Sequence, residues 1–176
     1  MFLDGYKAES GLPGALVDLQ EAADFSGPFR AFLPAPAFLS SRVAVITGGG
    51  SGIGEIVAKY WVQNGGKVVL ADVVEEGLSR VENEIREMGG EAVSIRCDVT
   101  KEEDNAALAQ KAIDTFGAIN LVVPCAGIIK DGLFLSPDKE TGKVSRKMSL
   151  EQFQSVLEIN VTGVFLTVRE CGEQMI

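Results

Sequence analysis

Histidine is missing from this chain of 176 residues, which holds only three cysteines, two tyrosines and one tryptophan. Without histidine the chain cannot form a Ser–His–Asp triad or a metal site built on imidazole ligands. Cys97, Cys125 and Cys171 lie far apart in the sequence and form no Cys-x-x-Cys pair. Because disulfide scaffolds are dense in cysteine and usually hold an even number, we expect reduced thiols in a cytoplasmic protein.

Positive charge is also scarce, because 16 lysines and arginines stand against 25 aspartates and glutamates, which gives a net charge of −9. This balance argues against nucleic-acid binding, which needs a basic face. We expect no membrane partner, because no apolar run is long enough to cross a bilayer. Asp4 and Glu9 also stand where a signal peptide would carry positive charge and then an apolar segment. With 46% hydrophobic and 23% charged residues, the composition predicts one globular domain.

The pattern of the sequence changes near residue 41. Residues 1–41 are rich in proline and phenylalanine, and we expect an N-terminal extension with a short helix within 12–25 and an extended segment over 27–36. Such an arm would cover its apolar side chains either on its own domain or on a second subunit. From residue 42 to 176, short apolar runs alternate with helical patterns, as in a nucleotide-binding domain.

The regular part predicts an α/β fold: a doubly wound parallel sheet of about four strands in the order 3-2-1-4. Strands are expected at 43–47, 67–72, 92–97 and 119–123, and helices at about 52–64, 75–88, 100–116 and from 149 onward. Thr100 with Glu103, and Ser149 with Gln152, have the spacing of capping boxes. The apolar stripe of the last helix is expected to be its buried face: Phe153, Val156, Leu157, Val161, Val164, Phe165, Val168 and Cys171.

A glycine-rich stretch, Thr-Gly-Gly-Gly-Ser-Gly-Ile-Gly from Thr47 to Gly54, stands between the first strand and the first helix. Its spacing is Gly48-x-x-x-Gly52-x-Gly54 rather than a literal Gly-x-Gly-x-x-Gly. Glycines let the backbone approach a phosphate, and a helix N-terminus offers free N–H groups and a partial positive charge. The stretch therefore predicts an anion site, with a tight turn that binds nothing as the alternative.

Two aspartates end predicted strands. Asp72 follows the glycines by roughly 20 residues, where an acid can accept both ribose hydroxyls of an adenosine and would repel a 2′-phosphate. Neither Gly50 nor Val73 supplies a cation for such a phosphate, so the sequence favours NAD over NADP. Asp98 is placed to accept from the adenine amino group, with Val99 against the ring. Each aspartate has an alternative role in capping a helix or a loop.

These motifs, in this order, resemble those of the short-chain dehydrogenase/reductase family. The segments are TGGGSGIG at 47–54, Asp72 at a strand end, CDVT at 97–100, PCAG at 124–127 and INVTG at 159–163. The resemblance covers the chain from about residue 41 onward. It implies a Rossmann-type domain that transfers hydride between the nicotinamide ring of NAD and a carbonyl or alcohol.

The resemblance also implies roles for single residues. The diphosphate would be held by Gly48, Ser51, Gly52, Ile53 and Gly54, the adenosine by Asp72, Val73, Asp98 and Val99, and the nicotinamide-side ribose by Ala126 and Gly127, beside Cys125. Asn160 matches the catalytic asparagine, whose backbone in this family helps to hold a water that links the active-site lysine to solvent. The alternative for Asn160 is an amide satisfied within helix packing.

Two departures from the family pattern stand out. Cys125, after Pro124, takes the place of the asparagine in the family's Asn-Ala-Gly turn. The catalytic serine and the Tyr-x-x-x-Lys pair are absent, because the chain's tyrosines are Tyr6 and Tyr60 and neither has a lysine four residues later. That tyrosine moves the proton in the family, with a pKa lowered by the lysine. The chain alone is therefore expected to bind a cofactor and to be inactive.

The preferred hypothesis is the N-terminal portion of an NAD(H)-dependent short-chain oxidoreductase, truncated before the catalytic pair. Residues 126–133 resemble the 3-oxoacyl reductase branch, which implies a 3-oxoacyl, 3-hydroxyacyl or similar alcohol/carbonyl substrate. The alternative is a non-catalytic dinucleotide-binding or interaction protein. An unpaired fourth strand predicts association, either as a homo-oligomer or with a complementary chain that carries the C-terminal half. The polar stretch 136–147 is expected to be a surface loop, either neutral or a contact for substrate or partner.

Overall fold

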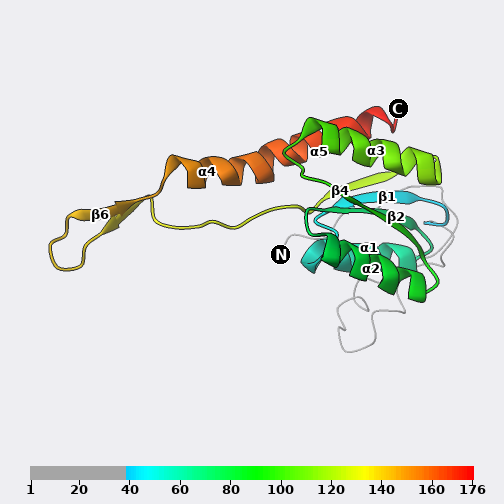
Figure 1. The fold of residues 1–176 in the computed structure, drawn as a ribbon, viewed down its shortest axis with the longest axis horizontal. Coiled ribbons are helices and arrows are strands. Elements are labelled where there is room, and N and C mark those ends of the chain that lie inside the picture. The colour runs from blue at the N-terminus through cyan, green and yellow to red at the C-terminus, as the bar shows by residue number, and fades with distance from the viewer. Residues whose placement is uncertain (1–38) are drawn as a thin grey trace, which may run out of the picture. The chain divides into compact units, whose positions relative to one another are not determined.

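A four-stranded parallel sheet organises the part of the chain that the computed structural model describes, residues 39–176 (Figure 1). The strands are β1 (Val43–Thr47), β2 (Lys67–Asp72), β3 (Glu91–Arg96) and β4 (Leu121–Pro124), in the order β3-β2-β1-β4. Every neighbouring pair is parallel. The predicted sheet order is therefore confirmed, and the predictions for the N-terminal extension lie outside the described residues.

Helices cover both faces of this sheet. Helices α1 (Gly52–Gln63) and α2 (Glu75–Glu87) lie on one face, and α3 (Glu102–Phe116) and α5 (Gly163–Glu173) lie on the other (Figure 1). Successive side chains of a strand point to opposite faces. Accordingly Ala44 and Ile46 pack with α1 and α2, whereas Val43 and Val45 pack with α3 and α5. Both layers are needed to bury β1, which explains its unbroken apolar run.

The start of α3 corrects one capping prediction. The helix begins at Glu102, and no side chain caps it among residues 39–176. Thr100 is not the cap, because Asp98 Oδ1 accepts both its backbone N–H (3.0 Å) and its hydroxyl (2.8 Å). The Thr100 side chain therefore forms a local turn with Asp98 instead of capping α3.

The long C-terminal helix is interrupted. It consists of α4 (Leu150–Leu157), a π-helical segment η3 (Glu158–Thr162) and α5. Ser149 caps α4 as predicted, since its hydroxyl accepts from the Gln152 N–H at 3.0 Å. The reciprocal half of that capping box is wrong: within residues 39–176 the structure shows no hydrogen bond from the Ser149 N–H to the Gln152 side chain, whose Nε2 donates to the Lys130 carbonyl at 2.9 Å.

The stripe that was expected to be the buried face of this helix is mostly exposed. Phe153, Leu157, Val161, Phe165 and Val168 are between 42% and 59% exposed, and only Cys171 of the stripe is buried. The residues of α5 that are buried are Gly163, Leu166, Thr167 and Cys171. The prediction was wrong because α5 packs on the domain through a different face, formed by these four residues, while α4 lies beyond the sheet and buries no residue (Figure 1).

Residues 136–147, expected as a loop, belong to an antiparallel hairpin that begins at Leu135. Its strands are β5 (Leu135–Pro137) and β6 (Val144–Lys147). Asp138 stabilises the turn, because its Oδ1 accepts from the Thr141 N–H and hydroxyl, both at 2.8 Å. No helix within 39–176 has both the length and the apolar character needed to cross a membrane.

Candidate functional site

A cleft of about 340 Å³ opens at the carboxyl ends of the strands. It lies where β1 and β4 are neighbours, which is the switch point of the doubly wound sheet. Every residue predicted to contact the cofactor lines this cleft: Gly48, Ser51, Gly52, Ile53, Gly54, Asp72, Val73, Asp98, Val99, Cys125, Ala126 and Gly127. Cys97, Ile128 and Ile159 also line it and were not predicted. The sequence thus foresaw the location, and the role of each residue stays a prediction.

The glycine turn is packed too closely to admit side chains at two positions. Gly48 has φ +65°, and a Cβ there would lie 2.8 Å from the backbone of Cys125 and Ala126. A Cβ at Gly54 would lie 2.2 Å from the Gly48 carbonyl oxygen. Thr47 joins the turn to β4, since its hydroxyl accepts from the Ala126 N–H at 3.3 Å. These contacts hold the turn against the segment that follows β4.

The first turn of α1 faces the cleft with free donors. The N-cap residue Ser51 makes no side-chain cap hydrogen bond. The N–H groups of the first helical turn have no partner within the helix, and Gly52, Ile53 and Gly54 all line the cleft. A Cβ at Gly52 would meet no atom within 4 Å, so the space above this turn is open. The geometry fits an anionic group such as a diphosphate.

Asp72 has two structural partners besides its place in the cleft. Its Oδ2 accepts from the Gly50 N–H, and its Oδ1 accepts from the Val74 N–H, both at 3.1 Å. It therefore ties the glycine turn to β2 and caps the segment before α2, as the alternative interpretation proposed. Each carboxylate oxygen retains a further lone pair for a donor in the cleft, so both roles are compatible.

Asp98 is likewise engaged by its own loop. The Thr100 hydroxyl, by donating to it, lowers the pKa of the Asp98 carboxyl below its usual range, so the side chain is an anion. Its N–H donates to Asp104 Oδ2 at 2.8 Å. Next to it, burial raises the pKa of the Cys97 thiol to about 12, so this cleft residue is a neutral thiol. The cleft therefore combines the free amides of α1 with two carboxyl groups, that of Asp72 at the end of β2 and that of Asp98 just after β3.

A buried polar pair supports the β3 side of the cleft and was missed by sequence reasoning. Asn105 and Thr167 are fully buried, and the Thr167 hydroxyl donates to Asn105 Oδ1 at 2.8 Å. Asn105 Nδ2 donates to the carbonyls of Val99 (2.9 Å) and Lys101 (2.7 Å). Gly163 of α5 lies against the Val99 side chain, since a Cβ at Gly163 would lie 2.6 Å from a Val99 methyl. Val99 is thus held between α3 and α5.

Asn160 lies in η3 and holds the segment that follows β4. Its Oδ1 accepts from the Ile128 N–H, and its Nδ2 donates to the Ile128 carbonyl, both at 2.9 Å. Asn160 itself does not line the cleft, although its neighbour Ile159 does. The side chain is therefore used for structure, and a catalytic role for its backbone stays a prediction. Burial raises the pKa of Cys125, the residue in the family's asparagine position, so it too is a neutral thiol.

A family model described as short chain dehydrogenase matches residues 42–176. An uncharacterized oxidoreductase of Thermotoga maritima is 32% identical over 139 residues, which are 78% of this chain and 50% of that protein. A 2,5-dichloro-2,5-cyclohexadiene-1,4-diol dehydrogenase of Sphingobium indicum is 35% identical over 74% of this chain and 47% of its own length. The chain thus spans about half the length of these curated relatives.

Solved structures of similar fold agree with this match. The citronellol catabolism dehydrogenase AtuB of Pseudomonas aeruginosa superposes with a TM-score of 0.68 at 30% identity, covering 82% of this chain and 54% of that one. A hydroxysteroid dehydrogenase from Escherichia coli gives a TM-score of 0.65 at 31% identity, covering 78% of this chain and 53% of its own.

Proposed function

Because this chain belongs to the short-chain dehydrogenase family, we propose that it is the NAD(H)-binding part of an oxidoreductase that interconverts an alcohol and a carbonyl. One observation supports the proposal most: the open first turn of α1 and the Asp72 carboxylate line the same cleft at the sheet's switch point. Nicotinamide dinucleotides carry a diphosphate and ribose hydroxyls, which are the groups that such donors and acceptors bind. When bound, the nicotinamide ring supplies or accepts the hydride.

The cleft offers each part of the dinucleotide a matching surface. The diphosphate fits the amides at Gly52–Gly54, and the adenosine fits the side formed by Asp72 and Val99. The nicotinamide-side ribose then falls near Ala126 and Gly127, on the far side of β1. This assignment places the reacting ring toward η3, where Ile159 lines the cleft and Asn160 fixes the neighbouring backbone.

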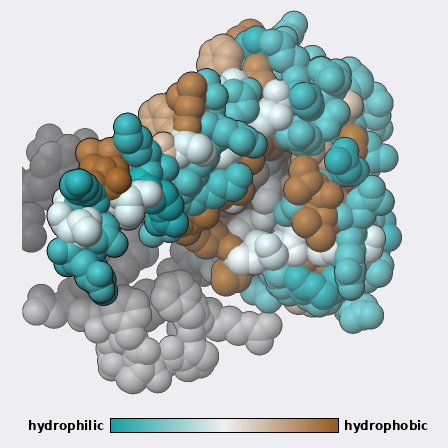
Figure 2. Space-filling model, turned by 60° about the vertical axis from the view of Figure 1, so that its left-hand side comes forward, coloured by the Kyte–Doolittle hydropathy of each residue, from teal (hydrophilic) through white to brown (hydrophobic). Residues whose placement is uncertain are grey.

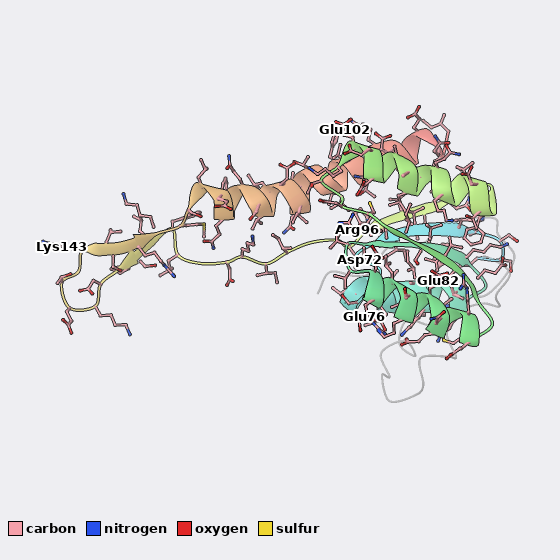
Figure 3. All side chains as sticks on the ribbon, viewed as in Figure 1. Asp72, Glu76, Glu82, Arg96, Glu102 and Lys143 are labelled. Carbon is pink, nitrogen blue, oxygen red and sulfur yellow. The ribbon has the colours of Figure 1, made fainter. Side chains whose placement is uncertain are left out.

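The charges around Asp72 support NAD rather than NADP. A 2′-phosphate at this ribose would face the Asp72 carboxylate. Arg96 is the register partner of Asp72 on β3, and both lie at the same end of the sheet (Figure 3). Its Nε, however, is 3.9 Å from the Glu75 carboxylate. Arg80, beside the glycine turn, is paired with Glu55 and Glu84. Arg80 is therefore compensated by close acids, whereas the exposed Arg96 contacts Glu75 only at the distance limit of an ion pair. The preference for NAD thus depends on the Asp72 carboxylate.

Titration of the chain with NADH and with NADPH tests the proposal. We expect saturable binding of NADH and weaker binding of NADPH. Asp72→Ala removes charge-assisted hydrogen bonds to the ribose, worth about 1.5–3 kcal/mol, together with the repulsion of a 2′-phosphate. The affinity ratio NADH/NADPH should therefore fall by about tenfold or more. Some loss for both ligands is expected from the released Gly50 N–H, and an unchanged ratio would remove the assignment of NAD.

Catalysis by the chain alone is not part of the proposal. Tyr6 and Tyr60 are its only tyrosines, and neither begins a Tyr-x-x-x-Lys motif. We propose that turnover needs a catalytic serine and a Tyr-x-x-x-Lys motif, which this sequence does not contain. The second candidate is a non-catalytic dinucleotide-binding protein, which the lining of the cleft would serve equally well. The intact mass of the natural gene product distinguishes the two, as does activity after mixing with a polypeptide that carries the missing motif.

The exposed apolar residues of α4, η3 and α5 support an association proposal. The face drawn in Figure 2 carries several exposed apolar patches, and α4 to α5 contribute exposed residues to the surface: Leu150, Phe153, Leu157, Val161, Phe165 and Val168. Isolated apolar residues are common on surfaces, but a continuous row along a helix marks a contact site. We propose that a second copy or a complementary chain covers this row.

A further inference from the structure

The tip of the glycine turn is held from outside the cleft by α2. The Gly50 carbonyl accepts from Arg80 Nη2 at 3.2 Å, while the Gly50 N–H donates to Asp72 at 3.1 Å. A Cβ at Gly77 would lie 2.7 Å from the same carbonyl oxygen, so a glycine there allows α2 to approach the turn. Both backbone polar groups of Gly50 therefore have a fixed partner, and the orientation of this peptide depends on Arg80.

Arg80 is itself one of a cluster of four charged side chains that restrain one another. Its guanidinium forms a two-pronged contact with Glu55, with Nη2–Oε2 at 2.6 Å and Nη1–Oε1 at 3.0 Å. Nη1 also contacts Glu84 Oε1 at 3.0 Å, and Lys59 pairs with both acids. Paired geometry of this kind restrains the guanidinium in one orientation. The cluster joins α1, which carries Glu55 and Lys59, to α2, which carries Arg80 and Glu84.

The position of Glu55 gives this cluster a functional consequence. Glu55 follows Gly54 directly and so belongs to the first helical turn whose amides face the cleft, while its carboxylate contacts Arg80 and Lys59. An uncompensated anion there would repel a diphosphate. Arg80 and Lys59 neutralise it, and their hydrogen bonds lower the pKa of Glu55 to about 2. The same guanidinium that compensates this charge also holds the Gly50 carbonyl.

We propose that Arg80 is a positioning residue for the diphosphate. By fixing the Gly50 carbonyl and compensating Glu55, it pre-organises the glycine turn and the first amides of α1 before the ligand arrives. Pre-organisation increases affinity because less ordering is needed on binding. This inference rests on the proposed nucleotide-binding function and adds a residue outside the cleft lining.

Two ligands separate a positioning role from a general structural one. ADP and adenosine share the adenine and the ribose and differ in the diphosphate. In calorimetric titrations of the full chain, Arg80→Met should weaken ADP binding about five- to tenfold and change adenosine binding less than about twofold. Arg80→Lys keeps the charge but not the two-pronged contact with Glu55, so it should recover part of the ADP affinity. If Arg80→Met does not fold, the ADP and adenosine affinities of Arg80→Lys, compared with those of the wild type, test whether Arg80 positions the diphosphate.

Arg86→Met is the matched control. Arg86 lies on α2, pairs with Glu82 and donates to the Ala92 carbonyl, with no hydrogen bond to the glycine turn. Its loss should leave the affinity for both ligands within about twofold of the wild type. Equal losses of ADP and adenosine affinity in the Arg80 variants, or unchanged ADP affinity, would overturn the inference while leaving the proposed function intact. Failure of the wild-type chain to bind either ADP or NADH would overturn both.

Discussion

Replacing Thr167 by valine tests the buried polar pair that supports Val99. Valine keeps the shape of threonine and exchanges the hydroxyl for a methyl group. Within residues 39–176, the Thr167 hydroxyl is the donor that the structure gives to Asn105 Oδ1, at 2.8 Å, and it also contacts the Gly163 carbonyl at 2.9 Å. Both side chains are 0% exposed, so water cannot replace the lost donor. The variant therefore leaves a buried acceptor unsatisfied without opening a cavity.

The expected cost follows from these contacts. A buried acceptor without a donor costs about 1–3 kcal/mol. Burial of the added methyl group offsets at most about 0.8 kcal/mol of that. If the middle of the first range, about 2 kcal/mol, is taken, Thr167→Val should lower the free energy of unfolding by about 1–2 kcal/mol. With an m-value of about 2 kcal/mol/M, the urea midpoint should fall by about 0.5–1 M while the m-value stays unchanged.

Urea unfolding followed by the fluorescence of Trp61, at one fixed protein concentration, measures this change. Thr115→Val is the matched control, because Thr115 is exposed on α3 and should shift the free energy of unfolding by no more than about 0.5 kcal/mol. The double variant Asn105→Ala/Thr167→Val should cost less than the sum of the single changes, since the two side chains share one bond. Additive effects, or a Thr167→Val midpoint within about 0.2 M of the wild type, would refute the reasoning.

Two further predictions concern the charged cluster and the exposed row. The folded-state pKa of Glu55 is about 2 against an ordinary 4.5, so its stabilising contribution is complete above pH 4.5 and is lost as the pH falls toward 2. Because solvent screens the charges of this cluster, this contribution is about 1 kcal/mol or less. The difference in unfolding free energy between wild type and Glu55→Gln should shrink by more than half from pH 6 to pH 2.5. A constant difference would contradict this assignment. For the apolar row, light scattering should show an assembly larger than one chain, and Phe153→Glu with Phe165→Glu should reduce its mass, whereas a monodisperse wild-type monomer would contradict the association proposal.

The strands that helices cover on both faces of the sheet could be predicted closely from the sequence. The bounds expected for β1 and β2 match the structure residue for residue, because the buried interior of a strand covered on both faces is an unbroken apolar run, which in β2 lies between Lys67 and Asp72. The site could be located for a similar reason. The glycine turn follows the end of β1 and Asp72 is the last residue of β2. Parallel strands bring their carboxyl ends to one edge of the sheet.

The features that were missed depend on contacts between distant residues. Asn105 and Thr167 are 62 positions apart, and each alone resembles an ordinary polar residue of a helix. The π-helical segment at 158–162 has no signal in an analysis that assumes 3.6 residues per turn. The capping box at Thr100 had the right spacing, yet Asp98 offered its hydroxyl a partner two residues away. Arg80 went unnoticed because its partner at the site is a backbone carbonyl.

The last helix shows why an apolar stripe does not by itself identify the face that packs on the parent domain. On α5 that face combines Leu166 with small and polar residues, because Gly163 lies in close contact with Val99 and Thr167 donates to Asn105. The wider apolar face, with Phe165 and Val168, stays exposed. A helix with two such faces has two different packing requirements: close approach on one side and apolar area on the other. The close side is satisfied within this chain, and the exposed side carries the area that our association proposal assigns to a partner.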